Sequence, residues 1–97
     1  MEVLINKVTT SSQVDLVASL AKTIWPEHYS PIIGKEQVDY MLGKYQTPKS
    51  ILAQMDQEGN YYFLIYTDFV PVGYIGIIEK HNELFLSKLY ILSAERG

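Results

Sequence analysis

The stretch YYFLIYTDFVPVGYIGIIEKHNELFLSKLYIL, residues 61–92, decides the fold of this chain. It is rich in aromatic and β-branched residues, which favour extended backbone, and polar residues interrupt it twice. The interruptions predict turns that divide the stretch into three antiparallel strands, 61–67, 72–79 and 83–92. The apolar character of 61–67 predicts a strand covered on both faces.

Two glycines, Gly73 and Gly76, stand in the middle one of these strands. Glycine is unfavourable inside a strand unless it serves a purpose, so the pair predicts a bulge or a close approach of two backbones.

The residues before this stretch predict a short half-buried strand that ends near Val8 and then a helix. Thr10 and Gln13 have the spacing of a capping box, which marks a helix start. Pro26 is expected to end this helix at Trp25. Its buried face consists of apolar residues that recur every three or four positions: Val14, Val17, Ala18, Ala21, Ile24 and Trp25.

Two prolines and a glycine predict an ordered loop over residues 25–34. A second helix carries Val38, Met41, Leu42 and Tyr45 on one face, and Thr47-Pro48 begins a third, shorter helix that Gly59 terminates. The sequence therefore predicts a single α+β domain over residues 1–97, in the order strand, helix, helix, short helix and three-stranded antiparallel meander.

The composition excludes several classes of function. The net charge is −3, and the eight Lys and Arg residues are scattered, so we expect no nucleic-acid partner. The chain has no Cys, and its two histidines, His28 and His81, are far apart in sequence, so we expect no metal site. No apolar run is long enough to cross a bilayer, and the sequence predicts a cytoplasmic protein without a membrane partner.

The order of elements, with Val72-Gly73-Tyr74 in the middle strand and Leu89-Tyr90-Ile91-Leu92-Ser93-Ala94-Glu95-Arg96-Gly97 at the end, resembles the N-terminal half of the GNAT superfamily of acyl-CoA-dependent N-acyltransferases. In that family the fourth strand leads into a loop of pattern Arg/Gln-x-x-Gly-x-Gly/Ala at a helix start. Arg96 and Gly97 match its first two positions. Such a loop binds the coenzyme A pyrophosphate through backbone N–H groups.

The resemblance implies an N-acetyltransferase that moves an acetyl group from acetyl-CoA to an amine. It implies that the backbone of Leu89, Tyr90 and Ile91 pairs with the pantetheine arm and that Arg96 and Gly97 belong to the pyrophosphate site. Because the 97 residues hold only the first two positions of the loop, we expect this fragment to bind acetyl-CoA weakly or not at all and to be inactive.

The resemblance also places the 25–34 segment at the acceptor site, where Glu27, His28 and Tyr29 are candidates to orient the amine. The alternative is that these side chains are simply solvated. Glu83 is a weak candidate for the general base, because it is the only titratable residue at the start of the last strand. No acid can be assigned. The eight tyrosines would form a stacking surface only if they cluster, and Tyr61, Tyr62 and Tyr66 are better explained by strand packing.

Other interpretations remain open. The chain is alternatively a self-contained α/β module that binds a partner through an open sheet edge, or an acyl-CoA sensor without catalysis. The last strand, with Leu84, Leu86, Leu89 and Ile91, predicts an apolar edge and hence a homo-oligomer, or else disorder at the terminus. The acceptor amine and the acyl group stay undetermined.

Overall fold

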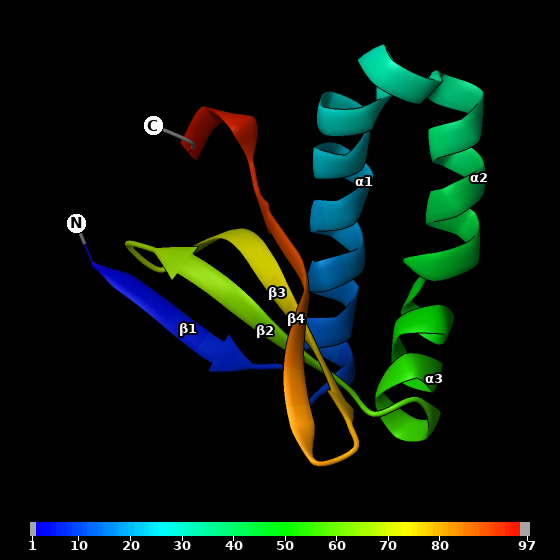
Figure 1. The fold of residues 1–97 in the computed structure, drawn as a ribbon. Helices are drawn as coiled ribbons and strands as arrows, with labels where there is room; N and C mark the ends of the chain where they lie inside the picture. The colour runs from blue at the N-terminus through cyan, green and yellow to red at the C-terminus, as the bar shows by residue number, and fades with distance from the viewer. Residues whose placement is uncertain (1, 96–97) are drawn as a thin grey trace.

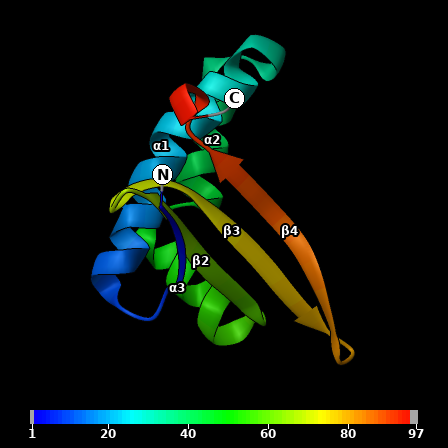
Figure 2. The same cartoon turned by 90° about the vertical axis from the view of Figure 1, so that its left-hand side faces the viewer.

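The computed structural model describes residues 2–95 as a four-stranded antiparallel sheet with three helices packed against one of its faces (Figures 1 and 2). The sheet order is the order of the sequence, β1-β2-β3-β4, which leaves β1 and β4 as edges. The elements are β1 (Val3–Lys7), α1 (Ser11–Ile33), α2 (Lys35–Tyr45), α3 (Pro48–Gln57), β2 (Asn60–Thr67), β3 (Val70–Lys80), β4 (Glu83–Ile91) and the 3₁₀ turn η1 (Ser93–Glu95). The predicted α+β class and order of elements are confirmed.

Helix α1 begins as the sequence predicts but ends later. The Thr10 hydroxyl accepts a hydrogen bond from the Gln13 N–H at 3.2 Å, and the Gln13 side chain accepts one from the Thr10 N–H at 3.0 Å. All six residues of the predicted buried face are buried. The predicted end at Trp25 and the predicted 25–34 loop are wrong, because α1 continues through Pro26 and Pro31 to Ile33.

The continuation past Pro26 has a tertiary cause. A proline removes one backbone donor from a helix and crowds the preceding turn, a cost that packing on both sides can offset. Trp25 before it is buried, and the rings of Trp25 and Tyr29 both pack against Tyr90 of β4, at centroid distances of 5.6 Å and 6.3 Å.

The predicted starts of the next two helices agree with the structure. Gly34, at φ +87°, separates α1 from α2. Thr47 caps α3 by accepting from the Ser50 N–H at 3.1 Å, and Pro48 is its first residue. Gly59, at φ +66°, follows the end of α3 and turns the chain into β2.

Two tight hairpins shape the meander. The turn residues Asp68 and Phe69, and likewise His81 and Asn82, all have positive φ, the conformation of the two-residue turns that match strand twist. Between Gly76 and Ile77 the register of β3 against β4 shifts, which leaves Ser87 of β4 as a bulge. The predicted bulge is therefore present.

The core lies between the helices and one face of the sheet, here called the inner face. No helix or strand of the described residues packs on the opposite face, which is turned toward the viewer in Figure 2. Strand β1 is consequently exposed rather than half-buried, with Val3 54% and Ile5 56% exposed. Strand β2 is covered by helices on one face only, since Tyr61 and Phe63 on the other stay partly accessible. Both of these expectations are wrong. The described helices cover one face of the sheet only, which leaves one face of β2 accessible. They do not reach over β1, since Leu4 on its inner face is also 39% exposed.

Candidate functional site

Aromatic rings from α1 and the sheet form one cluster on the inner face. Strand pairing sets Tyr74 opposite Tyr90, with ring centroids 5.4 Å apart. Trp25 lies 5.6 Å from the Tyr90 ring, and Tyr62 lies 6.1 Å from the Tyr74 ring. Tyr62, Tyr74 and Tyr90 therefore cluster, which strand packing alone did not require. The cluster joins α1 to β2, β3 and β4.

A chain of buried hydrogen bonds runs through this cluster. The Trp25 indole N–H donates to the Tyr74 hydroxyl at 2.9 Å, and that hydroxyl donates to Gln46 Oε1 at 2.7 Å. Gln46 Nε2 donates to the Tyr62 hydroxyl at 3.2 Å, which in turn donates to Gln54 Oε1 at 2.6 Å. Each of these polar atoms has a partner, so the cluster holds one arrangement of its side chains.

Burial keeps these tyrosines protonated. It raises the pKa of Tyr62, and it raises the pKa of Tyr74 and Tyr90 strongly. The hydrogen bond with Tyr29, whose hydroxyl lies 3.1 Å from the Tyr90 hydroxyl, raises the pKa of Tyr90 further. Near neutral pH these groups are hydrogen-bond donors and not bases.

The free edge of β4 opens onto a cavity beside this cluster. The cavity has a volume of about 280 Å³ and is lined by Ile24 and His28 of α1 and by residues 89–91 of β4. The Leu92 N–H donates to the Val72 carbonyl at 2.9 Å. Since alternate residues of an antiparallel strand face the same neighbour, the backbone groups of Leu89 and Ile91 face the open edge, whereas those of Tyr90 face β3.

The structure brings the predicted acceptor and cofactor residues together. His28 shares the cavity with Leu89, Tyr90 and Ile91, and it packs edge-on against the Tyr29 ring at 5.0 Å. The Glu27 carboxylate accepts a hydrogen bond from the Ser93 N–H at 3.2 Å, just beyond the end of β4. Glu27, His28 and Tyr29 thus lie on the last turns of a helix, and not on the predicted loop, yet beside the predicted strand.

The remaining predicted residues lie elsewhere. Glu83 is exposed at the first position of β4, beside the hairpin turn and roughly 25 Å along the strand from Ile91. The structure does not bring it to the cavity, and its catalytic role stays a prediction. Arg96 and Gly97 lie outside the described residues.

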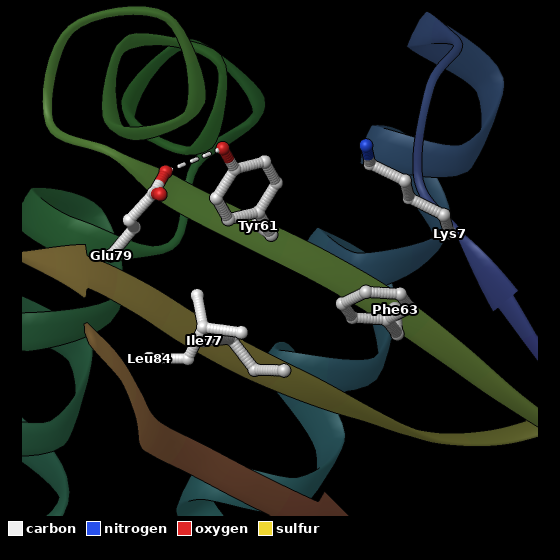
Figure 3. A pocket seen from close by; sticks show the side chains of 6 residues that line it. All are labelled: Lys7, Tyr61, Phe63, Ile77, Glu79 and Leu84. Carbon is white, nitrogen blue, oxygen red and sulfur yellow. Dashed lines mark hydrogen bonds between the residues drawn. The ribbon is translucent and has the colours of Figure 1, made fainter. Parts of the chain in front are cut away.

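A second cavity, of about 310 Å³, lies on the uncovered face of the sheet (Figure 3). Its polar groups already interact with each other: the Tyr61 hydroxyl donates to Glu79 Oε1 at 2.9 Å, and Lys7 Nζ lies 5.0 Å from the Tyr61 ring centroid. Apolar side chains of Phe63, Ile77 and Leu84 form the rest of its wall. It contains no arrangement suited to acyl transfer.

Within residues 2–95, no three His, Cys, Asp or Glu side chains lie close enough together to hold a metal ion. None of the helices in that same range combines the length and the apolar character needed to span a bilayer.

Reasoning from the sequence missed Gln46, Tyr74 and Lys88. Tyr62, Tyr74 and Tyr90 lie on the same face of three neighbouring strands. The tyrosine cluster could therefore have been found by pairing the predicted strands in the correct register. Gln46 is 2% exposed and follows an amphipathic helix, and no local pattern marks it as buried.

Comparison with known proteins found no matching family model and no matching curated protein. Solved structures do match. The PaiA N-acetyltransferase from Thermoplasma acidophilum, solved in complex with coenzyme A, superimposes with a TM-score of 0.82 at 15% identity over 98% of this chain and 62% of that one. An acetyltransferase from Thermus thermophilus gives 0.63 at 20% identity, covering 100% and 60% of the two chains.

A GCN5-related N-acetyltransferase from Ralstonia eutropha gives a TM-score of 0.65 at 11% identity, over 98% of this chain and 65% of that one. The chain therefore spans less than two thirds of the length of these structures. The strand, helices and antiparallel meander described here are the N-terminal half of a GNAT fold.

Proposed function

We propose that this chain is the N-terminal part of an acetyl-CoA-dependent N-acetyltransferase. The observation that carries the proposal is the free edge of β4 at Leu89 and Ile91, which opens onto the cavity containing His28. An extended pantetheine arm carries amide groups, and such a segment can add to an open strand as a further strand does.

The transfer itself needs a neutral amine. Its nitrogen bonds to the thioester carbonyl carbon, the carbon–sulfur bond breaks, the amine loses a proton and the departing thiolate gains one. A backbone N–H at the β4 edge is suited to stabilise the negative charge that develops on the carbonyl oxygen. Tyr90, kept neutral by burial, is a hydrogen-bond donor in the wall of the cavity.

The 97-residue chain is expected to bind acetyl-CoA weakly, because its sequence holds only the first two positions of the pyrophosphate loop. Titration of the ¹⁵N-labelled chain with acetyl-CoA, followed by NMR, tests both the weak affinity and the position of the pantetheine site. We expect millimolar affinity, with the largest shift changes at the amides of Leu89 and Ile91.

The site and the affinity are refuted by different results. Changes confined to the uncovered face, or none at all, would refute the pantetheine site. Micromolar affinity by calorimetry would refute the expectation of weak binding. An Ile91→Pro variant, which removes one donor from the β4 edge, should lose the response. Ile5→Pro is the matched control, because it removes a donor from the opposite free edge at β1, and it should keep the response.

A self-contained binding module is the second candidate. It is favoured by the uncovered face of the sheet, where Leu84, Leu86 and Leu89 are 68%, 64% and 55% exposed. A module of this kind would bind a partner through that face and would show no response to acetyl-CoA at the β4 edge.

A further inference from the structure

A third cavity, of about 300 Å³, lies on the inner side of β4 next to the aromatic cluster. Trp25 and Tyr45 form part of its wall, Glu58 and Asn60 stand at the junction of α3 and β2, and Lys88 enters from β4. Its volume is suited to a small molecule rather than to a polymer. None of the functional residues expected from the sequence lies in it.

Lys88 is placed in this cavity by the bulge in β4 and by Gly76. A Cβ at Gly76 would lie 3.2 Å from Lys88 Cβ and 3.3 Å from its Cδ, so only glycine leaves full room for the lysine stem. The ammonium group then lies over the Tyr62 ring, 5.5 Å from its centroid. The local irregularity of the sheet therefore has a specific consequence, a lysine held against the inner face.

The charge of this ammonium group is only partly compensated. Among the side chains that the structure describes, no carboxylate makes an ion pair with Lys88. Burial lowers the pKa of Lys88, and the nearby Glu58 partly opposes that effect. A partly buried cation is costly unless it is paired, so an anion that enters the cavity relieves this cost.

The side-chain N–H groups of Asn60 and Gln54 in the cavity are already engaged. The Asn60 side-chain N–H₂ donates to the backbone carbonyls of Gln54 and Glu58, at 3.3 Å and 3.2 Å. The Gln54 side chain donates to the Tyr45 carbonyl and accepts from Tyr62. Two opposite charges can therefore interact with a ligand: the ammonium group of Lys88 inside the cavity and the exposed carboxylate of Glu58 at its rim.

We propose that this cavity binds a small amino acid, with its carboxylate on Lys88 and its ammonium group toward Glu58. Lys88 immediately precedes Leu89, so the bound molecule lies beside the strand edge proposed for the thioester. That this amino acid is the amine that accepts the acetyl group rests on the proposed function. Its binding to the cavity does not depend on that function.

The single tryptophan of the chain, Trp25, lines the cavity and reports on it by fluorescence. Three probes of equal chain length separate the charges: 4-aminobutyrate carries both, butyrate only the anion and n-butylamine only the cation. We expect 4-aminobutyrate to change the emission saturably with millimolar affinity, butyrate to bind about tenfold more weakly, and n-butylamine to give no saturable change.

Variants locate the effect. Lys88→Met keeps the stem and should weaken 4-aminobutyrate binding about tenfold or more, whereas Lys88→Arg should retain most of it. Glu58→Gln should weaken binding of 4-aminobutyrate without weakening binding of butyrate. Lys49→Met, at an exposed position of α3, is the matched control and should change nothing. Circular dichroism of each variant verifies folding.

The proposal is overturned if no probe gives a saturable change up to about 50 mM, if n-butylamine binds as well as 4-aminobutyrate, or if folded Lys88→Met and Glu58→Gln both bind normally. None of these probe titrations includes acetyl-CoA, so the two proposals can fail separately. If 4-aminobutyrate binds but acetyl-CoA changes no NMR shift at the β4 edge, only the proposed function is refuted. The reverse pair of results would refute the amino-acid cavity alone.

Discussion

Tyr74 is the residue at which the buried hydrogen bonds meet. It is fully buried, accepts from the Trp25 indole at 2.9 Å and donates to Gln46 at 2.7 Å. One hydroxyl therefore satisfies two other buried polar groups. Because an unsatisfied buried group costs more than a hydrogen bond gains, this residue matters beyond the packing of its ring.

Tyr74→Phe removes the hydroxyl and keeps the ring. We expect the free energy of unfolding to fall by about 1–3 kcal/mol, because the Trp25 N–H and Gln46 Oε1 lose their partner. Urea denaturation measures the change. Tyr61→Phe is the control, since its hydrogen bond to Glu79 is exposed, and it should cost at most about 0.5 kcal/mol. Equal effects of the two substitutions would contradict the importance of the buried chain.

The buried tyrosines also predict a loss of stability at high pH. Burial raises the pKa of Tyr62 and Tyr74, so the unfolded chain releases these protons near pH 10 while the folded chain retains them. Their contribution is complete below that pH and falls as the pH rises, and for Tyr74, whose pKa is raised strongly, the fall is about 1.4 kcal/mol per pH unit. Lys88, whose pKa burial lowers, has the opposite effect over part of this range and reduces the net slope.

Urea denaturation at about pH 8, 10 and 11, which lie below, at and above the ordinary tyrosine pKa, measures this slope. Tyr74→Phe, with one such group fewer, should show the shallower decline. A free energy of unfolding that stays constant from pH 8 to about 11 would contradict the assignment.

At the scale of elements, β3 and β4 approach each other closely at Gly73. A Cβ there would collide with the Tyr90 carbonyl oxygen and lie 3.1 Å from Ile91 Cα, both backbone atoms of β4, the strand proposed to hold pantetheine. The glycine therefore fixes how β4 lies on the sheet.

Gly73→Ala should lower the free energy of unfolding by about 2–3 kcal/mol, since backbone atoms of β4 must shift. Gly43→Ala is the matched control: it lies inside α2 with nothing within 4 Å of the added Cβ and should raise stability by about 0.5–1 kcal/mol. Thermal denaturation compares the two. The steric argument does not survive if Gly73→Ala is neutral.

At the scale of the whole molecule, the sheet has helices on one face only. The exposed apolar residues Leu84, Leu86 and Leu89 share the other face, next to the unpaired edge of β4. An exposed edge with an apolar face is a template for association.

We predict that the 97-residue chain associates with a second copy of itself through this edge and face. Leu86→Lys should shift the assembly to monomer, because it places a charge in the apolar face, whereas Leu52→Lys, at an exposed position of α3, should not. Light scattering coupled to size-exclusion chromatography measures the mass. A monomer at high protein concentration rules the association out.

The sequence by itself determined the local structure of this protein. The Thr10–Gln13 capping box, the Thr47-Pro48 helix start and both hairpin turns depend on interactions between residues a few positions apart. Local pattern is sufficient for such features, and the structure confirms them, although β3 begins at Val70, two residues before the predicted start of the strand at 72. The order of these elements also pointed to the correct fold.

Only the tertiary structure decided the length of α1, the extent of the uncovered face and the composition of the cavities. Pro26 was a sound local stop signal, and packing of Trp25 and Tyr29 against Tyr90 of β4 overrode it. The placement of Lys88 and Glu58 in the wall of one cavity depends on a bulge in the sheet and on the packing of elements far apart in sequence, which no local pattern specifies. The physical reason is the same in each case: these features depend on burial against distant segments, and burial is a property of the folded chain.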